Sequence, residues 1–249
     1  MNVQQGTSDL VTSSLSDQLT RILWDRIVNL VYPLGTKIDV ESLKEEYGVS
    51  HIPIRDALHK LAEQGLVVVL PRIGYFTVEF SRNDVEELCD VRELMEVYSI
   101  SRSIDRVERE LLESHRAKHL LWRDRTAVSE KDAREFFELG ETLHREIIVG
   151  NAGSPLIEKI YSTLQGKIKM AARMRYLPPA ETDGFVRIPP EDTEEHIEII
   201  DALISGSKVD TKKSLKQHLK AVRKRMVSGE IENRLRSDVF AGMHRSGQP

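Results

Sequence analysis

Apolar residues recur every three or four positions along most of this 249-residue chain, and this helical spacing limits the possible fold more than any other feature. Beyond residue 82 the pattern predicts helices over 83–104, 107–126, 129–150, 154–176, 191–205 and 209–228. The proline-containing stretch 177–190 predicts a loop. Helices with one apolar face bury it against one another, so we expect an all-helical bundle in this part of the chain.

The first eighty residues follow a different pattern, in which three short helices precede two apolar, β-branched runs. We expect the helices to begin at caps near Ser16-Asp17, at Asp39 and at Ser50, and to end near Pro33-Gly35, Gly48 and Gly65. Strands are expected over 66–70 and 75–78, joined by a turn. Three helices followed by a β-hairpin form the layout of a winged helix-turn-helix. The predicted fold class is therefore mainly α, with a small β-hairpin wing.

Composition and patterning together divide the chain into four parts. We expect a disordered segment over 1–15, a winged domain over 16–80, an all-helical domain over 81–229 and a tail over 230–249. The single cysteine, Cys89, excludes an internal disulfide and is typical of a reducing cytoplasm. No apolar run reaches the roughly 20 residues of a membrane span, and the N-terminus lacks a signal-peptide pattern. We expect a cytoplasmic protein with no membrane partner.

The third predicted helix has two distinct faces. His51, Arg55 and His59 are spaced four residues apart on one face, whereas Ile54 and Leu58 lie on the opposite side. A helix of this kind suits the major groove of DNA, where Arg55 can contact guanine with two hydrogen bonds. The other interpretation is an ordinary solvated helix. With seven basic and ten acidic residues, the segment 1–80 has a charge of −3, which does not by itself favour nucleic acid.

A longer motif favours DNA binding. The stretch Gly48-Val49-Ser50-His51-Ile52-Pro53-Ile54-Arg55-Asp56-Ala57-Leu58 resembles the signature of the GntR family of bacterial transcription regulators, and Leu34-Gly35 and Pro71 extend the match. In that family the recognition helix and the wing bind operator DNA. The resemblance therefore implies DNA contacts by Ser50, His51, Ile52, Arg55, Arg72 and Gly74. His51 and Ile73 stand where basic residues are common, which predicts a shallower salt dependence.

Three histidines of the helical part, His144, His196 and His218, each lie beside an apolar stripe. If their rings meet inside the bundle, neutral imidazoles would form a metal site with open positions for water or a ligand. The other interpretation is three separate core histidines, because no two of them are close in sequence. Arg92 also borders a buried stripe and needs an anionic partner, either a ligand carboxylate or Glu96 one turn away.

The stretch Val91-Arg92-Glu93-Leu94-Met95-Glu96 resembles the opening helix of the FCD effector domain, found in the FadR-type branch of the GntR family. Leu143-His144, Glu195-His196 and Gln217-His218-Leu219 resemble its metal-binding positions. The resemblance implies an FCD-like bundle that dimerises and binds a small organic acid over a Zn-type divalent metal. It assigns effector binding to Arg92, His144, His196 and His218, and metal binding to the three histidines.

One position departs from the FCD pattern. The family's fourth ligand, an aspartate four residues before the first histidine, corresponds here to Gly140. Glu141 is adjacent but is expected to point about 100° away around the helix. Two alternatives follow. In the first, the three histidines hold the metal, and water or the effector completes the site. In the second, the cavity binds its ligand without metal. The missing side chain at Gly140 also leaves volume for a larger ligand.

Taken together, the sequence predicts a transcription regulator and not an enzyme. We expect a homodimeric repressor that binds a palindromic operator in double-stranded DNA and responds to a small carboxylate metabolite. One alternative is a metal-dependent hydrolase with a three-histidine centre, although no general base is evident beside the histidines. The second alternative is a winged domain that binds another protein, which the acidic balance of its charges would favour.

Overall fold

The computed structural model describes residues 14–174 and 185–227, and it divides into two compact units. One unit holds the residues up to Ile27 together with Val31–Val78. The other holds Val28–Leu30 and the residues from Glu79 onward. Of the two expected terminal segments, 1–15 and 230–249, all but Ser14 and Leu15 lie outside the described residues.

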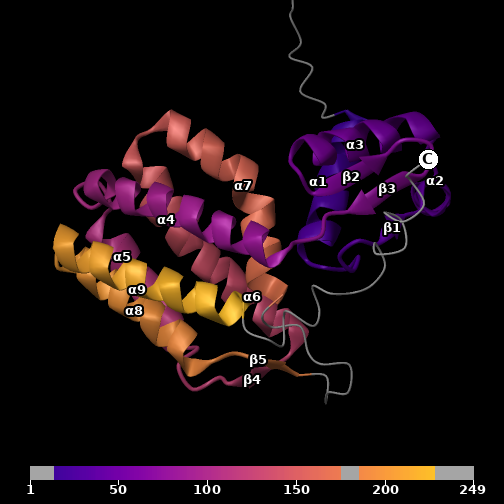
Figure 1. Ribbon diagram of the computed structural model, residues 1–249. Helices are drawn as coiled ribbons and strands as arrows, with labels where there is room; N and C mark the ends of the chain where they lie inside the picture. The colour runs from indigo at the N-terminus through magenta and orange to yellow at the C-terminus, as the bar shows by residue number, and fades with distance from the viewer. Residues whose placement is uncertain (1–13, 175–184, 228–249) are drawn as a thin grey trace, which may run out of the picture. The chain divides into compact units, whose positions relative to one another are not determined.

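The first unit is a winged helix-turn-helix, as predicted (Figure 1). Its antiparallel sheet has the strand order β1-β3-β2, with Ile38 opposite Tyr75 and Val68 opposite Phe76. The short strand β1, which the sequence pattern did not predict, adds a third strand to the hairpin. The elements are α1 (Leu15–Val28), β1 (Lys37–Ile38), α2 (Val40–Tyr47), α3 (His51–Glu63), β2 (Val67–Leu70) and β3 (Gly74–Thr77).

The ends of α1 differ from the prediction. The helix is capped by Ser14, whose Oγ accepts a hydrogen bond from the backbone N–H of Asp17 at 3.1 Å, so the expected cap near Ser16-Asp17 is wrong by two residues or more. The helix ends at Val28, well before Pro33. Leu30 takes a left-handed conformation with φ of 57° there, and the next amide donates to the Arg26 carbonyl at 2.9 Å. This reversal stops the helix without glycine or proline.

The caps of α2 and the inner face of α3 are as predicted. The Asp39 side chain accepts a hydrogen bond from the N–H of Glu41 at 3.0 Å, and Gly48 ends α2 in a left-handed conformation with φ of 63°. Ser50 occupies the N-cap of α3 but makes no side-chain capping bond. The inner face of α3 is fully buried and comprises Ile54, Ala57, Leu58 and Leu61.

The second unit is the predicted helical bundle (Figure 1). Its elements are α4 (Arg82–Ser103), α5 (Arg109–Leu120), β4 (Ala127–Val128), α6 (Glu130–Glu141), η1 (Thr142–Val149), η2 (Gly150–Ala152), α7 (Pro155–Met174), β5 (Val186–Arg187), α8 (Pro190–Ile204) and α9 (Lys208–Met226).

Two predicted segments of the bundle contain features that helical periodicity did not predict. The helix expected over 107–126 ends at Leu120, and β4 pairs with β5, which lies inside the expected loop 177–190. Residues 175–184 of that loop are outside the described part of the chain. The helix expected over 129–150 changes at Thr142 into the π-helix η1, where the wider turn alters which residues face the interior.

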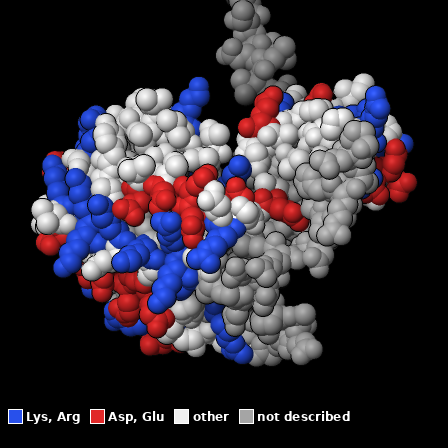
Figure 2. Space-filling view, in the orientation of Figure 1, with Lys and Arg blue, Asp and Glu red and all other residues white. Residues whose placement is uncertain are grey.

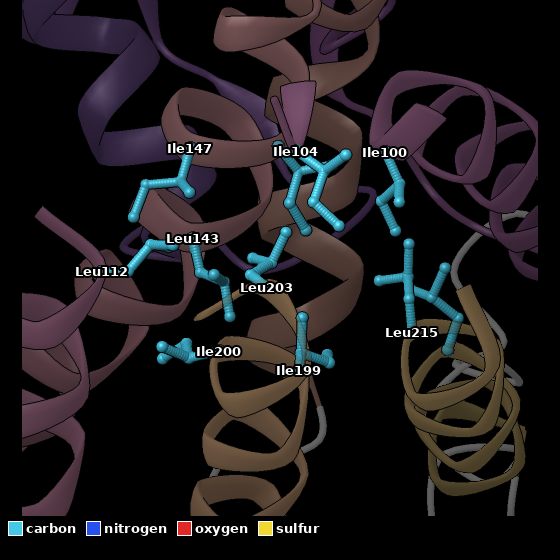
Figure 3. Packing of buried hydrophobic residues seen from close by; sticks show 11 residues of the cluster. Ile100, Ile104, Leu112, Leu143, Ile147, Ile199, Ile200, Leu203 and Leu215 are labelled. Carbon is cyan, nitrogen blue, oxygen red and sulfur yellow. The ribbon is translucent and has the colours of Figure 1, made fainter. Parts of the chain in front are cut away.

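The core of the bundle lies between α4, η1, α8 and α9 (Figure 3). Leu143 and Ile147 of η1 point toward Ile199, Ile200 and Leu203 of α8, and all five are buried. These side chains belong to one buried cluster, which ties η1 to α8 and so restricts the positions of the polar residues that the two elements carry. Among residues 14–174 and 185–227, no helix combines the length and the apolar character that a membrane span needs.

Two isoleucines on α3 test whether the described faces of this helix are assigned correctly. Ile54 is 0% exposed, so Ile54→Ala should lower the free energy of unfolding by about 2 to 5 kcal/mol. Ile52 is 71% exposed, and Ile52→Ala should change stability by less than about 0.5 kcal/mol. Chemical denaturation of the full chain, followed by circular dichroism, measures both. Equal effects of the two changes would contradict the assignment.

Candidate functional site

Three histidine rings converge inside the bundle, from η1 (His144), α8 (His196) and α9 (His218). All three are buried, and each offers a ligand atom within 4.8 Å of the other two. Nε2 of His144 lies 3.4 Å from Nε2 of His196. The interpretation of three separate core histidines is therefore wrong, because the packing of three helices brings together residues that are far apart in sequence.

Carboxylates bind the outer nitrogens of two of these rings. Nδ1 of His144 lies 2.7 Å from Glu96 Oε2, and Nδ1 of His218 lies 2.8 Å from Glu195 Oε2. Because an ionised carboxylate only accepts hydrogen bonds, each of these two Nδ1 atoms carries a proton, and Nε2 is the atom of each ring that faces the other histidines. Burial, followed by the neighbouring imidazoles, holds the pKa of His196 well below its ordinary value, so this ring is neutral. Neutral rings with free lone pairs are the form that binds a divalent metal.

Glu96 is the buried carboxylate shared by several of these groups. It accepts hydrogen bonds from Arg92 Nε at 2.7 Å and from the Tyr161 hydroxyl at 2.8 Å, in addition to its bond with His144. Burial alone would favour the neutral acid, but the charge of Arg92 and the contact with His144 outweigh it and hold the pKa of Glu96 well below its ordinary value. Of the two partners considered for Arg92, the internal one, Glu96, is present.

A cavity of about 60 Å³ lies beside the three rings, with Arg92, Tyr161 and Phe136 in its wall. This is room for a few water molecules or for a small ligand. Two further cations border it: Lys169 and Arg173 each lie 3.1 Å from a Glu138 oxygen. The cavity thus combines an apolar wall with three cationic side chains and two carboxylates, Glu138 and Glu141. An anionic ligand could replace Glu138 as the partner of Lys169 and Arg173.

Two expectations about the departure from the FCD pattern are wrong. Glu141 does not point away from the site but lines the cavity, where it accepts a hydrogen bond from Gln165 at 2.7 Å and burial raises its pKa. The volume freed at Gly140 is occupied by the ring of His196. A Cβ on Gly140 would lie 2.9 Å from His196 Cε1, so any side chain there would force this ring to move.

Sequence reasoning missed two more buried histidines, His115 and His119, one turn apart on α5. The ring centroid of His119 lies 4.9 Å from that of His115 and 4.9 Å from that of His196. Neither ring nitrogen of His119 has a hydrogen-bond partner among the described residues. Burial lowers the pKa of His115 to about 4 and that of His119 to about 3. Their spacing of four on an amphipathic helix was the available signal.

The residues predicted to contact DNA lie on α3 and the wing. Ser50 and Ile52 are exposed at the start of α3, whereas His51 is half-buried with Nε2 3.3 Å from Glu41 Oε1. Arg55 projects from the same helix into solvent. The third residue of the predicted face, His59, instead contacts the wing, because its Nε2 lies 3.2 Å from the Tyr75 hydroxyl.

The wing adds a second cationic group to this surface. Arg72 is exposed at the hairpin tip in a left-handed conformation with φ of 65°, and Gly74 follows with φ of 138°. Arg55, Arg72, Gly74 and Lys37 line one depression between the wing, β1 and α3. Asp39 and Glu41 line the same depression, so its charge is mixed, with three cationic side chains and two acidic ones. The DNA contacts themselves remain predictions.

Two family models match the chain. Residues 15–77 match the model described as bacterial regulatory proteins, gntR family, and residues 87–221 match the FCD domain model. The HTH-type transcriptional repressor RspR of Escherichia coli (strain K12) is 24% identical over 213 residues, which cover 85% of this chain and 88% of that protein. The gluconate operon transcriptional repressor of Bacillus subtilis (strain 168) is 26% identical over 165 residues, 66% of each chain.

Solved structures show the same two-part fold. Escherichia coli McbR/YncC superposes with a TM-score of 0.69 at 16% identity, covering 86% of this chain and 98% of that one. A GntR protein from Rhodococcus sp. RHA1 superposes with a TM-score of 0.67 at 19% identity, covering 87% and 99%. These likenesses confirm the predicted combination of a winged helix-turn-helix with an all-helical domain.

Two glutamates on α4 test the importance of the shared carboxylate. Removing Glu96 leaves Arg92 buried without its partner, so Glu96→Ala should lower the free energy of unfolding by about 3 to 5 kcal/mol. The matched control is Glu93, whose side chain is 39% exposed and 4.0 Å from Lys216; Glu93→Ala should cost less than about 1 kcal/mol. Denaturant titration of both variants measures the difference. A cost for Glu96→Ala no larger than the control's would contradict this account.

Proposed function

We propose, from the fact that this chain belongs to the gntR family of bacterial regulatory proteins and carries an FCD domain, that it is a repressor whose operator affinity responds to a small carboxylate. Family membership itself makes the chain a DNA-binding transcription regulator and not an enzyme. Several relatives are named repressors, RspR and the gluconate operon repressor among them, and this supports repression as the outcome.

The observation that carries the ligand response is the cavity beside His144, His196 and His218, with a guanidinium in its wall. The planar fork of Arg92 suits a carboxylate, and only its Nε has a hydrogen bond among the described side chains, to Glu96. Lys169 and Arg173 also line the cavity, where each is paired with Glu138. A small anion is the ligand that this wall would attract most strongly.

The three histidines fit a divalent metal of the zinc type, because their buried rings converge and two of them are positioned by carboxylates at Nδ1. His144, His196 and His218 would hold the ion, which supplies a Lewis-acid position for an oxygen of the effector. Gly140 provides no fourth ligand, so water or the effector would complete the set. Glu96 orients His144 and neutralises Arg92 in the absence of any ligand.

DNA recognition is assigned to residues 16–80 and effector binding with dimerisation to residues 81–229. Arg55 reads a base in the major groove from α3, while Ser50, His51 and Ile52 lie at its start. Arg72 and Gly74 place the wing against the backbone or the minor groove. A homodimer would present two such units to a palindromic operator, one for each half-site.

Arg55→Ala tests the DNA-reading role. Loss of a bidentate contact to guanine should weaken operator binding by about 1 to 3 kcal/mol, roughly 5- to 150-fold, without changing stability. The matched control is Arg134→Ala on α6, an exposed arginine paired with Glu130, which should leave binding unchanged. Fluorescence anisotropy with a duplex selected by the wild-type protein from a random pool measures both. Unchanged affinity in Arg55→Ala would contradict the role assigned to it.

Metal binding is tested directly with the purified full chain. After dialysis against Co²⁺ or Zn²⁺ we expect about one ion per chain by elemental analysis, with a visible Co²⁺ absorption band. His196→Ala should abolish the band, whereas His51→Ala, which changes a histidine of the other unit, should keep it. If neither metal binds the wild-type protein, the metal part of the proposal fails and direct ligand binding in the cavity remains.

A further inference from the structure

Two histidines of α5 lie beside the proposed metal site but outside its group of three. His115 and His119 are 3% and 0% exposed. The ring centroid of His119 lies 4.9 Å from that of His196 on one side and 4.9 Å from that of His115 on the other. We call these three rings the imidazole row. It links α8, which carries a proposed metal ligand, to α5.

Four ring nitrogens of the imidazole row have no hydrogen-bond partner among the described residues. They are Nε2 of His115, both nitrogens of His119 and Nδ1 of His196. All four are buried, where an unpaired polar group is costly. Centroids 4.9 Å apart are close to the separation of two imidazoles that share an N–H···N hydrogen bond. Because a histidine ring turns easily about its Cβ–Cγ bond, neighbouring nitrogens can align without a shift of the backbone.

Carboxylates are abundant on the outside of the bundle but do not serve this row. Figure 2 shows acidic side chains over α4 next to Lys and Arg over α9, and such charges pair with one another there. Inside, Glu96 and Glu195 bind Nδ1 of His144 and His218. Among the residues that the structure describes, no carboxylate binds Nδ1 of His196. This ring therefore needs another partner if it is to be oriented like the other two.

The proton of the ring at one end of the row is fixed by the backbone. The carbonyl of Leu139, which precedes Gly140 on α6, accepts a hydrogen bond from His115. Since Nε2 of His115 has no partner among the described residues, the donor is Nδ1. Burial lowers the pKa of His115 to about 4, so the ring is neutral at physiological pH. A neutral imidazole has only one N–H, so Nε2 of His115 can only accept a hydrogen bond.

The positions of the protons on the other two rings follow from this end. Burial lowers the pKa of His119 to about 3 and holds that of His196 well below its ordinary value, so both rings are neutral. His119 can satisfy His115 only by donating its single N–H, and its other nitrogen must then accept. The proton that it accepts is the one on Nδ1 of His196. The lone pair of His196 then lies on Nε2, the atom 3.4 Å from Nε2 of His144.

We infer that His119 is a positioning residue for the metal site of the proposed function, on which this role rests: it accepts the Nδ1 proton of His196 and donates its own proton to His115. The hydrogen bonds then run in one direction, from His196 through the two rings of α5 to the carbonyl of Leu139. An imidazole does for His196 what a carboxylate does for the other two rings of the site. It leaves Nε2 of His196 available to a divalent ion.

The first test uses the full chain without metal. Nitrogen-15 NMR should show a proton on Nδ1 of His196, together with a nitrogen–nitrogen coupling across the hydrogen bond from that atom to a ring nitrogen of His119. A proton on Nε2 of His196 would contradict the order of protons along the row. The absence of the coupling would show that the two rings share no hydrogen bond and would overturn the role of His119.

The second test measures the Zn²⁺ affinity of the full chain by competition with a chelating dye. His119→Leu removes the acceptor at similar size, so the Zn²⁺ dissociation constant should rise about 10- to 100-fold. His119→Gln keeps one acceptor and one donor and should recover most of this loss. The matched control is Thr193→Val: Thr193 is also buried on α8, one turn before His196, and its hydroxyl has no partner among the described residues. It should leave the affinity unchanged, and circular dichroism should show equal helix content in all variants.

The outcomes separate the role of His119 from the metal site itself. A wild type that binds Zn²⁺ while His119→Leu binds it equally well overturns the positioning role and leaves the metal site standing. A loss in His119→Leu that His119→Gln does not reduce would assign the effect to packing and would also overturn the role. A wild type that binds no Zn²⁺ overturns the metal part of the proposed function, and the NMR of the metal-free chain then decides the order of protons by itself.

Discussion

The carboxylate of Glu96 is the interaction on which the rest of the helical domain depends. It is fully buried and joins Arg92 on its own helix to His144 on η1 and Tyr161 on α7. Without it, a guanidinium would stand unpaired in the interior, and such a charge costs several kcal/mol. When Glu96 is present, its hydrogen bonds orient the His144 ring and hold Arg92 at the cavity wall. Stability and the proposed ligand recognition therefore depend on the same side chain.

The other histidines are positioned by packing as much as by hydrogen bonds. Glu195 holds His218, but His196 has no carboxylate on Nδ1, and its ring packs against the bare backbone of Gly140 and beside His119. Gly140 stands where the family has an aspartate. Because it has no side chain, it leaves space for the His196 ring, which any larger residue would displace. The His196 ring thus fits at the position where the FCD pattern has an aspartate, and in the proposed metal site the fourth position would be left to water or effector.

Much of the fold follows from the sequence because it depends on local signals. Asp39 and Gly48 set the ends of α2, and the apolar spacing of Ile54 and Leu58 fixes the inner face of α3. Features that depend on tertiary contacts could not be predicted in this way. The pairing of β4 with β5 joins segments some sixty residues apart, and the π-turns of η1 depend on packing, so they left no periodic signal.

The central claim is that Glu96 holds His144 with a proton on Nδ1, which makes Nε2 the atom that would bind a divalent ion at the proposed site. Nitrogen-15 NMR of the imidazole side chains, recorded during a titration with Zn²⁺, measures this most directly. The account predicts a protonated Nδ1 on His144 before metal is added, and a shift of the Nε2 resonances of His144, His196 and His218 as Zn²⁺ binds. A proton on Nε2 of His144, or resonances that Zn²⁺ leaves in place, would contradict it.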